Sequence, residues 1–413
     1  MIERYLNIAR EVIDLSLKQG AEQVSVSLAN ATSFQLEVRN QNIEALKEAG
    51  SSGIHVTLAK NQKRSTLSSN DFRLETLEPL IRSTLEALPL MGEDPFYTLP
   101  DPKLQGKAEI DLQFRDPNFE KMASTEKINE LMLLEKEALS IDSRLQTEEI
   151  SFSDSISYMV HGDSNGFLEG CSKTLCSQGV SMFAEDGGEE TEGSSQSLNT
   201  GRKQSDGWYS SSRFRKDLES REDLARKAGE RTLRKLGSVK PKSCEVPVVF
   251  STEMAQSFLG SLASAMMGDN VFRKHSFLKD SLGETVANPE IRLSDEPLLP
   301  GKLGSRHYDN EGVKATPLML IDQGKLLSFM CSTYSANKLD RQSTGHAGGI
   351  SNLMLKPGSY SDEELIASID NGLYLTGMSG QGVNLTTGDY SRGAQGLWIR
   401  KGKLAEPVSE FTI

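Results

Sequence analysis

With 413 residues, of which 37% are hydrophobic and 25% charged, the chain can bury sizeable cores, and its length indicates two or three domains rather than a disordered polypeptide. The net charge of −12 argues against nucleic-acid binding, because affinity for phosphates depends largely on clustered lysine and arginine. The four cysteines, Cys171, Cys176, Cys244 and Cys331, do not make a disulfide framework, so we expect them to be reduced.

The N-terminal segment has the pattern of an amphipathic helix. Residues 4–19 place Ala9, Val12 and Ile13 on one face, and Gly20 suits the left-handed position after the last turn. Charged residues interrupt this segment every few positions, so it resembles neither a signal peptide nor a membrane span. We therefore expect a cytoplasmic protein without a membrane partner.

Three short segments and a second helix follow. Residues 23–28, 33–39 and 53–58 alternate apolar and polar side chains, which predicts half-buried antiparallel strands. The next helix is predicted to begin near Asn70, and Pro79 is expected to bend or shorten it.

The middle of the chain changes from a connecting segment to a helix and then to strands. Residues 89–113 are rich in proline and charge, which marks a connection or a subdomain boundary. A third helix is predicted at 124–140. Residues 146–215 are predicted to be β-rich, and the Asn165-Gly166 pair favours a tight hairpin turn. The acidic run at 185–190 is expected to be a solvated turn rather than a calcium site.

A fourth helix at 220–236 precedes the main predicted boundary, a segment at 238–247 that contains two prolines. We therefore predict an N-terminal α/β region with an antiparallel sheet at 1–237, with a possible subdivision near 90–115. A β-rich C-terminal domain is predicted at 238–413. The overall fold class is α+β.

The second half opens with a strand and an amphipathic helix within residues 246–274, VPVVFSTEMAQSFLGSLASAMMGDNVFRK. Either Ser251 or Thr252 can cap the start of this helix. The helix contains no histidine, and the first histidine after Val246 is His275. Short strands are predicted further on, separated by turn residues, and glycine becomes frequent toward the C-terminus.

Five motifs mark the C-terminal half: SFLKDSLGE at 276–284, DEPLLPGKLGSRHYDNEGV at 295–313, CSTYSANKL at 331–339, STGHAGGISNLMLKPG at 343–358 and GDYSRGAQGLWIRKGKLAEPVSEFTI at 388–413. Together they resemble the TldD/PmbA family, and more closely its PmbA (TldE) branch. The resemblance implies a barrel-like, β-rich C-terminal domain with peripheral helices. It also implies a subunit of a heteromeric zinc metallopeptidase whose TldD subunit carries an HExxxH helix.

Laid on that zinc helix, this chain has Gly260 and Ala265 at the two histidine positions and Ser261 at the position of the general base. A catalytic zinc needs about three protein ligands and an open position for water. Glycine, serine and alanine side chains supply none of these ligands. We therefore expect no catalytic or metal-binding residue and no cofactor in this chain, with zinc in a TldD-like partner.

Peptide contacts are predicted from the C-terminal loops. Arg306 could pair with a peptide carboxylate or with acidic residues of its own loop, and His346 is a second candidate. The segment containing Gly377, Gly380 and Gly382 lacks the end of a phosphate-binding loop, so we expect its glycines to form turns or to line a peptide cleft.

The sequence thus predicts a non-catalytic subunit that closes a cleft around an unfolded peptide beside a TldD-like partner, with a homodimer possible in isolation. Two alternatives remain. One is a self-contained hydrolase that uses Cys331, with His346 and either Asp309 or Asp389, or an unrecognised metal site. The other is a stand-alone peptide-binding or regulatory protein. Members of the family have been called modulators of DNA gyrase, but the negative charge argues against direct DNA contact.

Overall fold

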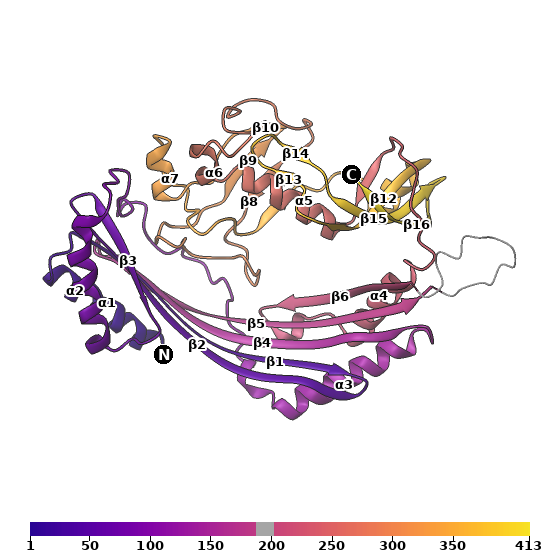
Figure 1. Cartoon of the computed structure of the whole chain (residues 1–413), viewed down its shortest axis with the longest axis horizontal. Helices are drawn as coiled ribbons and strands as arrows, with labels where there is room; N and C mark the ends of the chain where they lie inside the picture. The colour runs from indigo at the N-terminus through magenta and orange to yellow at the C-terminus, as the bar shows by residue number, and fades with distance from the viewer. Residues whose placement is uncertain (187–201) are drawn as a thin grey trace, which may run out of the picture.

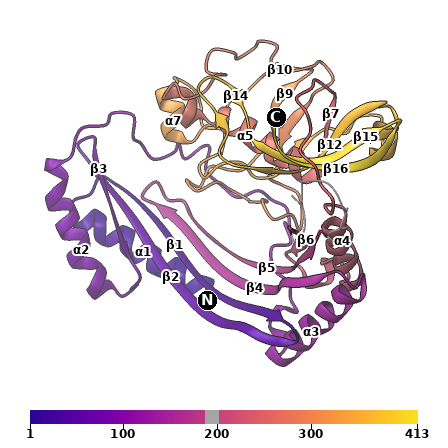
Figure 2. The ribbon, with the colours of Figure 1, turned by 45° about the vertical axis from the view of Figure 1, so that its right-hand side comes forward.

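The structure is a computed structural model that describes residues 1–186 and 202–413, so most of the acidic run at 185–190 lies outside the described residues. The first half of the chain forms a long, curved sheet, and the second half lies over the inner side of that curve (Figures 1 and 2). Within the described residues, no helix is long and apolar enough to cross a membrane.

The curved sheet has six antiparallel strands in the order β3-β2-β1-β4-β5-β6. Their bounds are β1 Gln23–Arg39, β2 Asn42–Lys60, β3 Lys63–Ser69, β4 Gln146–Asp163, β5 Leu168–Glu185 and β6 Lys203–Ser212. The accompanying helices are α1 Ile2–Lys18, α2 Leu74–Ala87, α3 Ser124–Ser140 and α4 Arg221–Leu233.

All four helices pack on the same face of this sheet. Along β1 the buried residues are even-numbered from Val24 to Val38, because successive side chains of a strand point to opposite faces. Val24, Val26 and Leu28 share a core with α1 and α2. Further along the same strand, Phe34 and Leu36 share a core with α3 and α4. The four helices thus cover the outer face of the sheet at its two ends.

Most elements of the first half agree with the sequence prediction. The helices predicted at 4–19 and 124–140 are confirmed as α1 and α3, and the positive φ of Gly20, 101°, suits the end of α1. Helix α2 begins at Leu74 and continues through Pro79. The separation of two strands at 23–28 and 33–39 is wrong, because β1 continues across the gap with unbroken pairing to β4.

The C-terminal half contains smaller elements. Its strands are β7 Val248–Phe250, β8 Leu293–Asp295, β9 Leu318–Asp322, β10 Lys325–Leu326, β11 Leu353–Leu355, β12 Asn371–Ser379, β13 Val383–Asn384, β14 Asp389–Tyr390, β15 Gly393–Arg400 and β16 Lys403–Thr412. Its helices are α5 Thr252–Ala265, α6 Gly268–Phe272, α7 Thr333–Lys338 and α8 Asp362–Ala367.

The described C-terminal strands form open sheets, which confirms the α+β class but corrects the barrel-like shape that the resemblance implied. One four-stranded sheet has the order β10-β9-β8-β11, and the other has the order β16-β15-β12-β7. A barrel requires a closed ring of tilted, paired strands. Strands as short as β8, β10 and β11 cannot supply such a ring, and each sheet packs its own apolar cluster instead.

One junction between the two halves lies at the β6 edge of the curved sheet. Val239 forms a bridge with Val408 of β16, and Ser238 Oγ lies 3.1 Å from Ser409 Oγ. Arg202 pairs with Glu410 at 3.2 Å across the same junction. The domain boundary predicted at 238 falls at this junction but stays a prediction.

Two adjacent leucines of helix α3 allow the packing of the core on the outer face to be tested. Leu134 is fully buried, whereas its neighbour Leu133 is 42% exposed. We predict that Leu134→Ala lowers the free energy of unfolding by about 2–5 kcal/mol because it leaves a cavity, and that Leu133→Ala changes it by less than about 1 kcal/mol. Thermal and urea unfolding of both variants measure the difference. Equal losses would contradict this packing of α3.

Candidate functional site

The inner face of the curved sheet is lined with small polar side chains, unlike the outer face. Several odd-numbered positions of β1, β4, β5 and β6 carry serines that are only half-buried. We call the surface that they form the serine face: Ser33, Ser151, Ser153, Ser155, Ser177 and Ser211. Ser153 lies opposite Gln35 on one side and Ser177 on the other, and Ser177 Oγ lies 2.7 Å from Ser211 Oγ. Tyr209, which lies on β6 two residues before Ser211, is 69% exposed.

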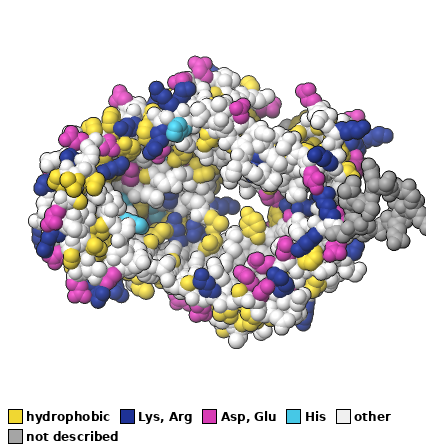
Figure 3. Space-filling view, in the orientation of Figure 1, with side chains coloured by type: hydrophobic (Ala, Val, Ile, Leu, Met, Phe, Trp, Pro, Cys, Tyr) yellow, Lys and Arg dark blue, Asp and Glu magenta, His cyan; other side chains and the backbone are white. Residues whose placement is uncertain are grey.

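This face is turned toward the C-terminal half, and the space-filling view shows the molecule hollowed between the two halves (Figures 1 and 3). Hydroxyl groups on a sheet can form hydrogen bonds with a polypeptide without presenting an apolar surface to it. The hollow is therefore a candidate site for an extended chain.

Helix α5 in the C-terminal half carries the positions that the resemblance matches to zinc ligands. Ser261 Oγ donates a hydrogen bond to Ser257 O within the helix at 3.3 Å, and Ala265 is fully buried. Gly260 faces open space, so nothing in the packing prevents a larger side chain there. Within residues 1–186 and 202–413, no group of three or more histidine, cysteine, aspartate or glutamate residues is placed to hold a metal ion. The side chains of α5 thus do not fit a zinc ion.

Arg306 and His346, two predicted peptide contacts, interact with other parts of the protein. Arg306 Nη2 donates to Gly349 O at 2.6 Å. His346 is 2% exposed, and its Nε2 lies 3.0 Å from Asp295 Oδ2. In this structure the His346 side chain is therefore inaccessible to a peptide. The Arg306 bond holds its own loop against the segment that contains Gly349.

Asp295 is the centre of this buried cluster. Its Oδ1 accepts a hydrogen bond from Ser351 N at 2.9 Å, and its Oδ2 accepts one from Ser351 Oγ at 2.6 Å. Burial alone would raise the pKa of Asp295, but hydrogen bonds from His346 and Ser351 and the attraction of His346 outweigh it, so the pKa is lowered. The cluster ties β8 to the segment containing His346 and Ser351.

The self-contained hydrolase alternative requires the Cys331 thiol beside a ring nitrogen of His346. The two residues are neighbours, since His346 N donates to Cys331 O at 3.4 Å, but among the described residues no hydrogen bond joins the thiol to the imidazole. Burial, the largest effect on this thiol, raises the pKa of Cys331 to about 11, so the thiol stays protonated at neutral pH. The ring nitrogens of His346 lie against Asp295 and Thr344. Asp309 accepts hydrogen bonds from backbone amides, and Asp389 lies on an exposed strand. All four cysteines of the chain are free.

The three predicted glycines serve different purposes. A Cβ at Gly377 would overlap the Gln395 side chain of the neighbouring strand, and a Cβ at Gly382 would overlap the Ser391 carbonyl. Gly380 has a φ of 81° and faces open space. Gly377 and Gly382 thus permit close approach of neighbouring chain segments, and a peptide contact by any of the three glycines stays a prediction.

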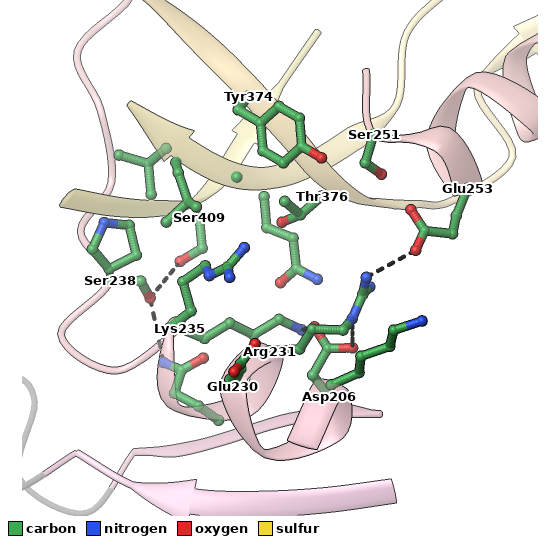
Figure 4. Close-up of a pocket in the computed structure, with 18 of the residues that line it drawn as sticks. Asp206, Glu230, Arg231, Lys235, Ser238, Ser251, Glu253, Tyr374, Thr376 and Ser409 are labelled. Atoms are coloured by element: carbon green, nitrogen blue, oxygen red, sulfur yellow. Dashed lines mark hydrogen bonds and ion pairs between the residues drawn. The ribbon is translucent and has the colours of Figure 1, made fainter. Parts of the chain in front are cut away.

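A cavity that the sequence did not reveal lies where α4 faces the β16-β15-β12-β7 sheet. Its volume is about 440 Å³, and β6 and the start of α5 also contribute to its lining. Figure 4 shows Arg231 at its centre, bonded to Glu253 of α5 at 2.9 Å and to Asp206 of β6 at 3.4 Å. Lys235 also pairs with Asp206, at 3.0 Å. The pair between Arg231 and Glu253 joins the two halves of the chain at the cavity, whereas both pairs of Asp206 lie within the first half.

Nothing in the local sequence marks this cavity. Trp208, Ser251, Tyr374 and Val408 all line it, although they lie far apart in the chain. Only the positions of α4 and the C-terminal sheet bring them together. The pairing of Arg231 with Glu253 could not be inferred from spacing, since the two residues belong to different helices.

Asp295 generates a pH-dependent prediction. Because its pKa is lowered in the folded state, its contribution to stability is present above about pH 4 and is lost as the pH falls below that value. Asp295→Asn should therefore lower the thermal midpoint most at neutral pH, and the gap from the wild type should narrow as the pH falls toward 3. Asp280→Asn, at a side chain that is 85% exposed, is the control and should show no gap. A gap independent of pH would contradict the prediction.

Gly382 provides a second test. Gly382→Ala should destabilise the protein by about 1–3 kcal/mol, because the added methyl group meets the Ser391 carbonyl. Gly358→Ala should change stability by less than about 0.5 kcal/mol, since no atom lies within 4 Å of the added Cβ. Unfolding curves of the two variants make the comparison, and equal stability would show that the segment around Gly382 is not packed as described.

Comparison with known proteins reveals similarity along the whole chain. The PmbA/TldA metallopeptidase central domain matches residues 117–236, and the PmbA/TldA metallopeptidase C-terminal domain matches residues 243–413. The "Metalloprotease PmbA homolog" of Buchnera aphidicola is 32% identical over 99% of this chain and 88% of its own length. "Metalloprotease PmbA" of Escherichia coli O157:H7 is 29% identical over 100% of this chain and 89% of its own length.

Solved structures share the fold. A Bacteroides thetaiotaomicron protein named for modulation of DNA gyrase has a TM-score of 0.89 and 29% identity, over 98% of this chain and 89% of its own. TldE from Thermococcus kodakarensis has a TM-score of 0.84 and 20% identity, over 98% of this chain and 90% of its own, which shows the fold alone. The matched domains and the full-length relatives together show that this chain belongs to the PmbA/TldD family.

Proposed function

We propose that this chain is the non-catalytic subunit of a TldD/TldE-type zinc metallopeptidase, and that it acts in the cytoplasm on unfolded peptides. The names of its relatives, metalloprotease PmbA and TldE, support a role in peptide hydrolysis. A TldD-like partner would supply the zinc site. Two copies of this chain could pair through the same surface when the partner is missing.

The observation that carries the proposal is the chemistry of α5. Metal-bound water becomes an effective nucleophile only when about three ligands hold the metal and a nearby base accepts the proton. Gly260, Ser261 and Ala265 offer no such ligand or base, while the rest of the fold is retained at full length. A protein that keeps the fold without the ligands is suited to shaping a chamber rather than to cleaving bonds.

The curved sheet supports the chamber role in two ways. The serine face offers hydroxyl groups along the hollow, where an extended peptide has many unpaired amide groups to satisfy. In addition, β3 pairs only with residues 54–60 of β2, so residues 42–53 of β2 have a free edge within the described sheet. An extended peptide or a partner strand can be added to such an edge through backbone hydrogen bonds.

The central experiment compares hydrolysis of an unstructured peptide by this chain, by a TldD-like subunit from the same organism, and by a mixture of the two. We predict that this chain alone releases no fragments and that the mixture cleaves faster than either subunit. Mass spectrometry of the products measures the rates. Cys331→Ala in the mixture is the control for thiol chemistry and should leave the rate unchanged, since the thiol is buried. Cleavage by the lone wild-type chain would overturn the proposal.

A further inference from the structure

We propose that the cavity between α4 and the C-terminal sheet binds the C-terminal carboxylate of a peptide whose last side chain is apolar. The choice of a peptide as ligand rests on the proposed function, but the site is argued from the cavity itself. Its volume of about 440 Å³ lies within the roughly 300–1,000 Å³ of small-molecule sites, so it would hold the end of a peptide and not a folded protein.

The first observation is a hydroxyl without a partner. Ser251 is the N-cap residue of α5, and serine at that position normally accepts a hydrogen bond from an amide of the first turn. Here the side chain makes no such bond, is 4% exposed, and has no hydrogen-bond partner among the described residues. Figure 4 shows its oxygen directed into the cavity, toward the space between Thr376 and Glu253. A buried, unpaired hydroxyl costs free energy unless a ligand or water satisfies it.

The second observation is the end of the helix to which Ser251 belongs. The first intrahelical bond runs from Ala255 N to Ser251 O at 2.8 Å, so the amides of Thr252, Glu253 and Met254 have no acceptor within α5. Such an end carries a partial positive charge and favours an anion. Thr252 and Glu253 both line the cavity, beside Ser251.

The net charge of the cavity lining indicates which kind of anion it would bind. The lining includes four lysine or arginine side chains and three carboxylates, which leaves one positive charge in excess. Arg231 and Lys235 are paired with acidic residues, whereas Arg234 at the end of α4 forms no ion pair with any described residue. A single excess charge matches a monoanionic carboxylate better than a doubly charged phosphate. A guanidinium can bind a carboxylate through two parallel hydrogen bonds.

The apolar residues of the lining explain why the last side chain of the peptide should be apolar. Trp208, Leu397, Pro407 and Val408 line the cavity, and Leu397 and Val408 belong to the buried part of the C-terminal sheet. An apolar terminal side chain would gain about 25 cal/mol for each Å² that it buries against these groups. Bound in this way, a peptide would bridge α4 of the first half and the C-terminal sheet of the second, in addition to the ion pair that joins Arg231 of α4 to Glu253 of α5.

The test uses the full-length chain and the tetrapeptide N-acetyl-Ala-Ala-Ala-Leu, prepared with a free C-terminal carboxylate or with a C-terminal amide. We expect isothermal titration to show that the free acid binds at least about tenfold more tightly than the amide, as loss of a charged hydrogen bond implies. Ser251→Ala and Arg234→Gln should each weaken binding of the free acid by about five- to tenfold. Neither variant should bind the amide differently from the wild type.

Matched controls make the same chemical changes outside the cavity. Ser261→Ala lies further along α5, and Arg82→Gln lies on α2, where Arg82 pairs with Glu78 on an exposed surface. Both should bind the free acid as the wild type does. Equal binding of acid and amide, or undiminished binding by Ser251→Ala and Arg234→Gln, would overturn the inference, as would stronger competition by inorganic phosphate than by acetate.

These outcomes are separate from those that test the subunit role, because the titration needs neither a partner nor a metal. If the mixture of subunits cleaves peptide but the free acid does not bind here, the cavity inference fails and the subunit role stands. If the free acid binds here but no mixture of subunits cleaves peptide, the subunit role fails and the cavity inference stands.

Discussion

The alternation of side chains along the long strands of the curved sheet is the constraint on which the rest of the structure depends. Even-numbered residues of β1, such as Val26 and Leu36, face the helices, while odd-numbered residues such as Ser33 face the other half of the chain. A shift of one residue in register would exchange the two faces. The pairing of β1 with both β2 and β4 therefore fixes the apolar outer face and the polar inner face together.

The polar character of the inner face explains the hollow. An apolar inner face would favour close stacking of the C-terminal half across the whole sheet, because burial of apolar surface drives such packing. The serine face offers little apolar surface, so contacts between the two halves lie beyond it, either further along the inner face or at the edge of the sheet. One is at Lys173, whose Nζ donates to Ser305 O at 3.2 Å, and another is at the β6 edge, where Ser238 and Ser409 meet. The cavity at α4 belongs to this second junction.

The sequence predicted local elements well, because helices and half-buried strands leave periodic patterns. The bounds of α3 and the turn at Gly166, with a φ of 103°, follow from residues close together in the chain. Features that depend on distant residues were not predictable. The continuity of β1 depends on its neighbours β2 and β4, and the burial of His346 depends on Asp295, about fifty positions earlier. For the same reason the sequence could not reveal the cavity, or that the Ser251 hydroxyl makes no capping hydrogen bond at the start of α5.

The absence of ligand side chains on α5 was visible in the sequence, and the described structure provides no other cluster of ligands to replace them. The most direct test of the account is the zinc content of the intact complex and of each subunit, measured by native mass spectrometry. We expect this chain alone to retain no zinc, and a one-to-one complex with a TldD-like subunit to carry the zinc of that partner only. One zinc ion bound per isolated copy of this chain would contradict it.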